Sequence, residues 1–283
     1  MAVKYVYFFG AGKAEGKGSD RILLGGKGAG LAEMTSIGLP VPGGFTITTQ
    51  ACKLFYEKDK KWPPGLDTQV KQNLAKLEKV CRKKLGDAGD PLLVSVRSGA
   101  PVSMPGMMET VLNLGLNDRS VEGLSRCTGN PRFAWDSYRR FIQMYSTVVV
   151  GLPKDTLEHK LHELKTRVGA EADTDLTHEH LRQLCTDFKK FFREKTGRDF
   201  PQDPWDQLTG AIDAVFNSWM AEKAIKYRDV ERFFGLPGTA VSVCQMVFGN
   251  MGDDSGTGVC FPRDPNTGEN VFYGDYLINA QGE

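Results

Sequence analysis

The stretch that most constrains the fold runs from Leu93 to Asn113 and reads LVSVRSGAPVSMPGMMETVLN. It starts with β-branched apolar residues typical of a strand, delivers one arginine, Arg97, and then continues as small, flexible residues and methionines. A guanidinium fixed on a strand binds phosphate oxygens well, and a glycine-bearing loop beside it can close over phosphates. The stretch therefore predicts a phosphate site. The alternative is a strand, a turn and a methionine cluster that only fills a core.

A second glycine-rich segment, LLGGKGAGLAEM at residues 23–34, is predicted to be a loop that opens a helix. Helix N-termini attract anions, and Lys27 adds a compact positive charge for a phosphate oxygen. The spacing fits neither a Walker loop nor the glycine fingerprint of a dinucleotide-binding fold. A ligand loop and an ordinary tight turn are therefore equally open for this segment alone.

A third glycine-rich segment, FGNMGDDSGTGV at residues 248–259, lies between strand-like runs at 239–247 and 259–261. We predict a mobile hairpin lid whose backbone amides and Thr257 hydroxyl cover phosphates. A plain β-turn is the equally weighted alternative, because the sequence Asp-Asp-Ser-Gly also favours turns.

These three segments together resemble the nucleotide-binding domain of the pyruvate phosphate dikinase family, which is of the ATP-grasp type. The resemblance covers the whole chain and rests also on GFTITT (44–49), GNPRFAWDSYRRFIQMY (129–145), MVFGN (246–250) and YLINAQGE (276–283). Related dikinases that use water or glucan as second acceptor carry a more acidic loop in place of SMPGMM (103–108). That loop favours the pyruvate enzyme over a water dikinase (phosphoenolpyruvate synthase), which remains an alternative.

The resemblance implies a mixed fold, α+β or α/β: an ATP-grasp nucleotide-binding domain with an inserted helical subdomain, truncated at the C-terminus. It implies an α/β subdomain at 1–116 and 201–247, the helical subdomain at 117–200, and the start of a second ATP-grasp subdomain at 248–283. It also implies that ATP passes a pyrophosphoryl group to a histidine on a separate swivelling domain, and that phosphate and then pyruvate are the acceptors. A chain of 283 residues is long enough for about two domains, so it can hold only the ATP station.

The truncation is also expected from the sequence itself. Residues 271–279 read as an apolar strand that nothing later in the chain covers, and native proteins avoid such exposed edges. A non-catalytic fragment or assembly module is the alternative from another functional class.

Individual roles follow from the residue types and from the resemblance. Arg97 is expected to be catalytic, bridging phosphate oxygens and offsetting charge during transfer, while Lys27 holds the polyphosphate from the opposite wall. The other expected nucleotide contacts are Gly106 and Thr257 in the two closing loops, Gln245 and Met246 at the adenine, and Glu283 on the adenosine side. Mg²⁺ is expected to accompany ATP, but the family's acidic metal ligands follow Glu283, so no metal ligand is assigned here.

Other charged and sulfur-containing residues are given structural roles. Three arginines at helical spacing, Arg132, Arg139 and Arg140, are interpreted as a solvated or salt-bridged helix face. His159, His162, His178 and His180 are expected on the surface, and none is assigned catalysis. The six cysteines are widely spaced and contain no Cys-x-x-Cys, so we expect reduced core residues rather than zinc ligands or disulfides.

Charge and hydropathy restrict the partners. The 36 basic and 35 acidic residues leave a net charge of +1, which gives no field for nucleic acid or an anionic membrane. No run is long enough to span a membrane and no secretory signal is visible. We therefore expect a soluble intracellular domain, in the cytoplasm or an organelle such as the glycosome or a plastid, within a homo-oligomeric full-length enzyme.

Periodicity and helix-start signals predict the elements. Strands are expected at 5–9, 45–48, 92–97, from 240 onward and at 271–279. Helices are expected at 27–37, 50–56 and 66–85, then from Pro131, from Pro153 to about Val168, from Thr177 to about Gly197, and from Pro204 through Trp219. The run at residues 10–19 is expected to lengthen a surface loop.

Overall fold

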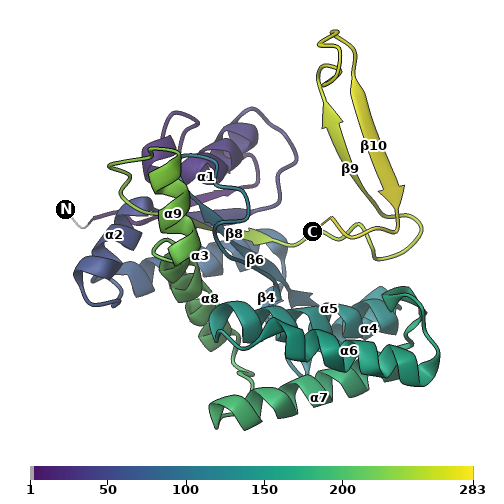
Figure 1. Ribbon diagram of the computed structural model, residues 1–283. Coiled ribbons are helices and arrows are strands. Elements are labelled where there is room, and N and C mark those ends of the chain that lie inside the picture. Colours follow the sequence, from purple (N-terminus) through teal and green to yellow (C-terminus); the bar gives the residue numbers. More distant parts are fainter. Residues whose placement is uncertain (1–2, 283) are drawn as a thin grey trace.

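A six-stranded sheet forms the centre of the computed structural model, which describes residues 3–282 (Figure 1). Its strands are β1 (Val6–Gly10), β2 (Lys13–Ala14), β3 (Gly44–Ile47), β6 (Val94–Gly99), β7 (Thr110–Leu114) and β8 (Ala240–Gln245). They are ordered β2-β1-β3-β8-β6-β7, and every neighbouring pair is antiparallel. The strand β8 lies between β3 and β6, so the sheet joins segments more than a hundred residues apart in the chain. The chain is a mixed α/β protein.

One face of the sheet carries the main apolar core. Phe45 and Ile47 on β3 alternate with Thr46, as expected for a strand whose two faces differ. They share one continuous core with Val96 and with Phe216. The helices that contribute to this core beside the sheet are α2 (Thr49–Glu57), α3 (Leu66–Cys81) and α8 (Pro204–Ser218).

The opposite face of the sheet is covered by α1 (Arg21–Ser36). Gly28 of this helix packs directly against Thr46. A Cβ added at Gly28 would lie only 2.7 Å from the Thr46 methyl carbon, so there is no room for a side chain there. Thr46, Ser242, Arg97 and Thr110 are consecutive register partners across β3, β8, β6 and β7. Directly opposed residues share a face, so Arg97 lies on the same face of the sheet as α1.

A helical region follows β7 in the chain. It contains α4 (Ser120–Thr128), α5 (Pro131–Met144), a π-helical turn (Tyr145–Val149), α6 (Lys154–Val168), a 3₁₀ turn (Asp173–Asp175) and α7 (His178–Thr196). The helix α5 connects this region to the sheet, since it contacts α4, α7 and β7. The Phe200 ring packs edge-on against four aromatic rings, those of Tyr138, Phe141, Tyr145 and Phe192.

The remaining elements lie at the ends of these layers. They are α9 (Glu222–Val230), the short parallel pair β4 (Lys84–Leu85) and β5 (Pro91–Leu92), and a hairpin of β9 (Gly256–Phe261) and β10 (Tyr273–Ile278). The hairpin extends away from the rest of the molecule (Figure 1, yellow). Its strands are exposed at nearly every position.

Most elements expected from the sequence are present, with different ends. The helix expected at 66–85 ends at Cys81, because Arg82 has a left-handed backbone (φ 54°). The strand expected at 92–97 is divided at Leu93 into β5 and β6. The helices opened by Pro131, Thr177 and Pro204 form as expected, and α9 was not anticipated.

The expected hairpin lid at residues 248–259 is wrong. The strands on either side of the glycine-rich segment do not pair with each other: β8 belongs to the central sheet, whereas β9 pairs with β10. Residues 248–255 are therefore a connection between two sheets. Its position is fixed by a hydrogen bond from Asn130 Nδ2 to the Met251 carbonyl (3.0 Å) and by an edge-on contact between Phe133 and Phe248.

Candidate functional site

Three cavities lie in a row on the α1 face, along the edge strand β7. The Arg97 cavity, of about 390 Å³, and the middle cavity, of about 770 Å³, share Leu112, Asn113, Arg140 and Gln281. The middle cavity in turn shares Met108 and Thr110 with the Lys27 cavity, of about 660 Å³. The three spaces are therefore adjoining parts of one trough.

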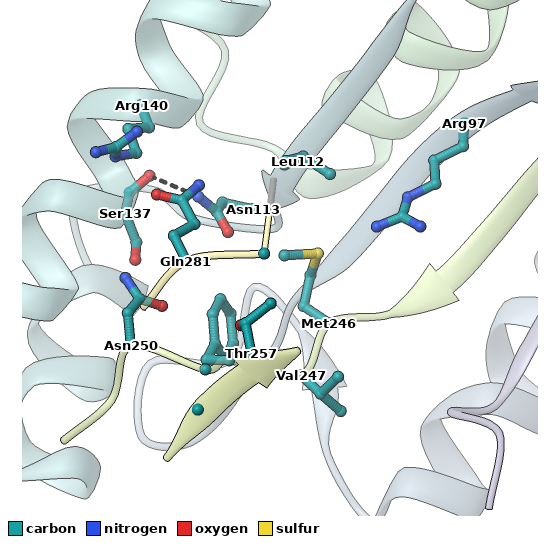
Figure 2. Close-up of a pocket in the computed structure, with 14 residues that line it drawn as sticks. Arg97, Leu112, Asn113, Ser137, Arg140, Met246, Val247, Asn250, Thr257 and Gln281 are labelled. Carbon is teal, nitrogen blue, oxygen red and sulfur yellow. Dashed lines mark hydrogen bonds between the residues drawn. The ribbon is translucent and has the colours of Figure 1, made fainter. Parts of the chain in front are cut away.

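Arg97 lies in the third-last position of β6 and points out of the sheet. Figure 2 shows its guanidinium extending toward Met246, while Thr257 approaches from the start of strand β9 and Gln281 from the segment after β10. The strand fixes the backbone of Arg97 on both sides, through β8 and β7. A cation held on a strand beside a cavity is an arrangement suited to a negatively charged ligand.

The Lys27 cavity is formed by the two glycine-rich segments, which touch. Gly25 has φ 70° and interrupts α1, and a Cβ added there would lie 1.8 Å from the Gly99 carbonyl oxygen. Gly26 N donates to the Ala100 carbonyl at 2.9 Å. The cavity is lined by Arg21, Lys27 and the loop 99–106, and no aspartate or glutamate is among its described lining residues. The cavity is thus lined by two positively charged side chains and by the loop backbone, an arrangement that suits an anion.

Lys27 and Arg97 share a face of the sheet but line different cavities. A Cβ built on Gly99 lies 3.7 Å from the Lys27 Cβ. Gly99 follows Arg97 by two residues on the same strand face, a separation of about 7 Å. The two cations therefore stand at neighbouring positions along the trough, and the middle cavity adjoins both of their cavities.

Gly106 lies in the loop that bounds the Lys27 cavity, and its φ of 71° suits glycine. Thr257 lies in strand β9 rather than in a turn. Its hydroxyl donates to the Ala280 carbonyl at 2.7 Å and so closes the base of the hairpin. Thr257 does line the Arg97 cavity, but its hydroxyl donates its hydrogen bond to the Ala280 carbonyl and not to a group inside the cavity.

Gln245 and Met246 end β8, where the chain leaves the sheet. The Cys81 thiol donates to Gln245 Oε1 at 3.2 Å, and Gln245 lines a smaller cavity of about 280 Å³ together with Leu124 and Cys127. Met246 lines both this cavity and the Arg97 cavity. Glu283 lies outside the described residues.

Arg140 is a cation of the site that the sequence interpretation treated only as part of a helix face. It lines the Arg97 and middle cavities, and its Nε donates to Asp136 Oδ2 at 2.9 Å. Arg139, which is 4% exposed, donates to the other oxygen of Asp136. Burial alone would raise the pKa of Asp136, but the two guanidinium groups outweigh it and hold that pKa below its ordinary value. The salt-bridged interpretation is confirmed for Arg139, while Arg140 also faces the trough.

The signal for Arg140 was present in the sequence as Asp136, Arg139 and Arg140 at helical spacing. What the spacing could not show is that this helix, α5, packs against β7 and so turns one arginine toward the trough. Arg132 instead donates to the Leu176 and Asp173 carbonyls, away from the cavities.

The histidines and cysteines contribute little to the trough. His159, His162 and His178 are exposed as expected, and His180 is half-buried as part of the α7 N-terminal cap. The expectation that the cysteines are core residues is wrong for Cys127 and Cys260, which are exposed; all six cysteines lie within the described residues, and none of them forms a disulfide. Within residues 3–282, no group of three or more histidine, cysteine, aspartate or glutamate side chains is placed to hold a metal ion. No helix in this described part of the chain is long and apolar enough to cross a membrane.

Sequence comparison shows the relatives of this chain. Residues 21–80 and 58–283 match the family described as "Pyruvate phosphate dikinase, AMP/ATP-binding domain". The chain is 54% identical to the pyruvate, phosphate dikinase of Rhizobium meliloti (strain 1021) and 54% identical to that of Clostridium symbiosum. Each alignment covers 99% of this chain. It is 52% identical over 100% of its length to pyruvate, phosphate dikinase 1, chloroplastic, of Arabidopsis thaliana.

The chain spans only part of these relatives. It covers 31% of the Rhizobium protein, 32% of the Clostridium protein and 29% of the Arabidopsis protein. The matched family describes a nucleotide-binding domain, and the trough with its cations and glycine-rich walls lies within the matched residues. The chain belongs to the family of pyruvate phosphate dikinase AMP/ATP-binding domains.

Proposed function

We propose that this chain is the ATP-binding part of a pyruvate phosphate dikinase and that the trough on the α1 face holds the nucleotide. The observation that carries the proposal is the row of adjoining cavities. Their walls contain the glycine-rich segments, and the cations that line them are Arg97, Arg140, Lys27 and Arg21. A triphosphate needs several cations and backbone amides along one line, and the trough supplies cations along one strand edge.

The strand register suggests the direction of the nucleotide. β6 and β8 are antiparallel, with Val94 opposite Gln245 and Gly99 opposite Ala240. Adenine near Gln245 and Met246 therefore places the phosphates progressively toward Arg97 and then Lys27. Gly106 then closes the phosphate end and Thr257 acts at the hairpin side, while Glu283 is proposed, on the resemblance alone, to contact the adenosine side.

In the proposed full reaction, ATP donates a pyrophosphoryl group to a histidine on a separate domain and leaves as AMP. Inorganic phosphate then removes one phosphoryl as pyrophosphate, and the phosphohistidine transfers the other to pyruvate, giving phosphoenolpyruvate. Arg97 would offset the negative charge that develops on the transferring group, and Lys27 would keep the polyphosphate oriented. These steps need parts of the relatives that this chain does not span.

Mg²⁺ is proposed to enter with ATP. Three or more clustered metal-ligating side chains are absent from residues 3–282. No residue of this chain is therefore assigned to the metal.

The domain architecture is proposed at the same level. We assign an ATP-grasp architecture. In this assignment, residues 1–116 and 201–247 form one ATP-grasp subdomain, 117–200 form an inserted helical subdomain, and 248–283 begin a second ATP-grasp subdomain. The return of β8 to the sheet after α4–α7 supports this assignment. A homo-oligomeric full-length enzyme and an intracellular location, with plastid forms among the relatives, also remain proposals.

Calorimetric titration of the chain with ATP and magnesium tests the proposed function. The wild-type chain is expected to bind, and Arg97→Ala is expected to weaken binding by about tenfold or more, because a charge-assisted contact contributes about 1.5–3 kcal/mol. Arg193→Ala, which removes a strongly exposed arginine on α7, is the matched control and should bind like the wild type.

Binding by neither the chain nor the full-length protein would refute a nucleotide site and favour an assembly module. Binding by the full-length protein alone would mean that residues outside this chain complete the trough. Consumption of inorganic phosphate during turnover of the full-length protein would exclude the water dikinase alternative, whereas turnover without it would support that alternative.

A further inference from the structure

The loop between β6 and β7, residues 100–109, is attached to the body of the protein at points far apart in sequence. On one side, Gly26 N of α1 donates to the Ala100 carbonyl. On the other side, Lys223 of α9 donates to Glu109 Oε1 at 2.8 Å and to the Gly106 carbonyl at 3.4 Å. Lys223 is more than a hundred residues from the loop in the chain, so only the tertiary fold creates this contact.

We propose that Lys223 is a positioning residue that latches the 100–109 loop, through Glu109 and Gly106, over the Lys27 cavity in the geometry that receives a polyphosphate. The identity of the ligand rests on the proposed function. The latch itself is a property of the protein and can be measured without nucleotide.

The latch acts on the loop at two positions that line the trough. Gly106 bounds the Lys27 cavity, and Glu109 lines the middle cavity immediately before β7 begins. The Glu109 carbonyl also accepts from Ser98 N at 3.4 Å, so a displacement of Glu109 would be passed to β6. An unpaired Glu109 carboxylate would also repel a triphosphate, and the Lys223 ammonium offsets that charge.

The contact is weak enough to open. The Lys223 and Glu109 side chains are 48% and 32% exposed, and ion pairs with such exposure are screened by water. A loop held by such a pair remains closed most of the time and can still release when a ligand enters or leaves.

Hydrogen exchange of the peptide covering residues 100–110, measured on the chain without nucleotide, tests the latch. Lys223→Met is expected to raise the exchange rate about two- to fivefold, and Lys223→Arg is expected to preserve protection. Lys223→Glu combined with Glu109→Lys should restore protection that each single variant loses. Lys226→Met is the matched control, since Lys226 pairs with Glu222 within α9 and should leave the loop unchanged.

The positioning role is tested by calorimetric titration with ATP and magnesium. Lys223→Met is expected to raise the ATP dissociation constant about two- to fivefold, with an unchanged unfolding midpoint as the check on folding. Exchange identical in Lys223→Met, Lys226→Met and wild type would overturn the latch. Faster exchange with unaltered ATP affinity would overturn the positioning role. Absence of ATP binding by every variant in the full-length protein, wild type included, would contradict the proposed function, while the exchange result still decides the latch.

Discussion

Single residues set the shape of the trough through backbone contacts as much as through charge. Gly25 permits α1 and the loop after β6 to touch, since its φ of 70° and the adjacent Gly99 carbonyl leave no room for a side chain. Asp136 holds Arg139 and Arg140 in place on α5. The glycine-rich sequence at 23–30 suggested a ligand loop, but the need for a bare backbone at Gly25 in particular became apparent only from its contact with Gly99.

Gly25→Ala is expected to damage the trough, because the new Cβ would lie 1.8 Å from the Gly99 carbonyl oxygen. We expect a loss of unfolding free energy of about 1–3 kcal/mol, typical of a residue forced into an unfavourable backbone region, and weaker ATP binding. Urea unfolding and calorimetric titration measure the two effects.

Gly30→Ala is the matched control on the same helix. Its added Cβ meets nothing within 4 Å and its backbone is helical, so this variant should be as stable as the wild type or more so, by up to about 1 kcal/mol. Equal behaviour of the two variants would contradict the close approach at Gly25.

Asp136→Asn is expected to lower the unfolding free energy at neutral pH by about 3 kcal/mol, because it removes the buried charge partner of Arg139 and leaves that arginine only its longer ion pair with Asp173, at 3.4 Å. The pKa of Asp136 is depressed in the folded state, so its ionised form stabilises the fold above the ordinary aspartate pKa, about 3.9, and this contribution is lost as the pH falls through the folded-state pKa.

Urea unfolding of wild type and Asp136→Asn between pH 3 and pH 7 measures this dependence. The difference in unfolding free energy between the two proteins should become smaller as the pH approaches 3. A difference that stays constant, or grows as the pH falls, would show that the carboxylate charge is not what stabilises the arginines. Asp187→Asn serves as the control, since Asp187 is a half-buried aspartate on α7 that accepts a hydrogen bond from the neutral Gln183 side chain.

At the scale of elements, helix starts were the features best predicted from sequence. Pro131, Thr177 and Pro204 each mark a helix start in the structure, because capping and proline geometry are local properties. Strand partners were not predictable in the same way. The segment 248–259 looked like a hairpin turn, yet its flanking strands join different sheets, since pairing depends on which distant strand is adjacent.

Asn130→Ala is expected to lower the unfolding free energy by about 1 kcal/mol or somewhat more. The Asn130 side chain accepts from Phe133 N and caps α5, and it also donates to the Met251 carbonyl. Thermal unfolding measures the loss, and Asn266→Ala at the exposed hairpin tip is the comparison. A midpoint unchanged in both variants would show that the cap is dispensable.

At the scale of the whole molecule, the sheet and the helices are well buried while the hairpin is not. Phe272, Tyr276 and Leu277 are 80%, 76% and 69% exposed on β9–β10 and its connection. Large apolar surfaces on a two-stranded sheet with open edges favour association with other molecules. The Arg97 cavity is lined by Gly256 and Thr257 at the base of this hairpin, so the position of the hairpin also limits access to that part of the trough.

The isolated chain is expected to self-associate with rising concentration through the hairpin. Phe272→Lys with Leu277→Lys should shift sedimentation velocity profiles toward the monomer, because both substitutions charge the exposed apolar surface. Thr267→Lys, at the hairpin tip, adds charge elsewhere and should have little effect. Association that persists equally in the double variant would locate the contact on another surface.

The sequence by itself determined most of the helices, several of their starts, the two segments that carry Lys27 and Arg97, and the family, because these depend on local chemistry and on residue identity along the chain. The tertiary structure alone decided that β8 enters between β3 and β6 and that Lys27 and Arg97 line cavities on one sheet face, both adjoined by the middle cavity. It also decided that Arg140 faces this trough and that Lys223 contacts the loop beside it. Strand order and helix packing bring together residues more than a hundred positions apart. No local pattern encodes those distances, since they are set by the packing of the whole chain around one core.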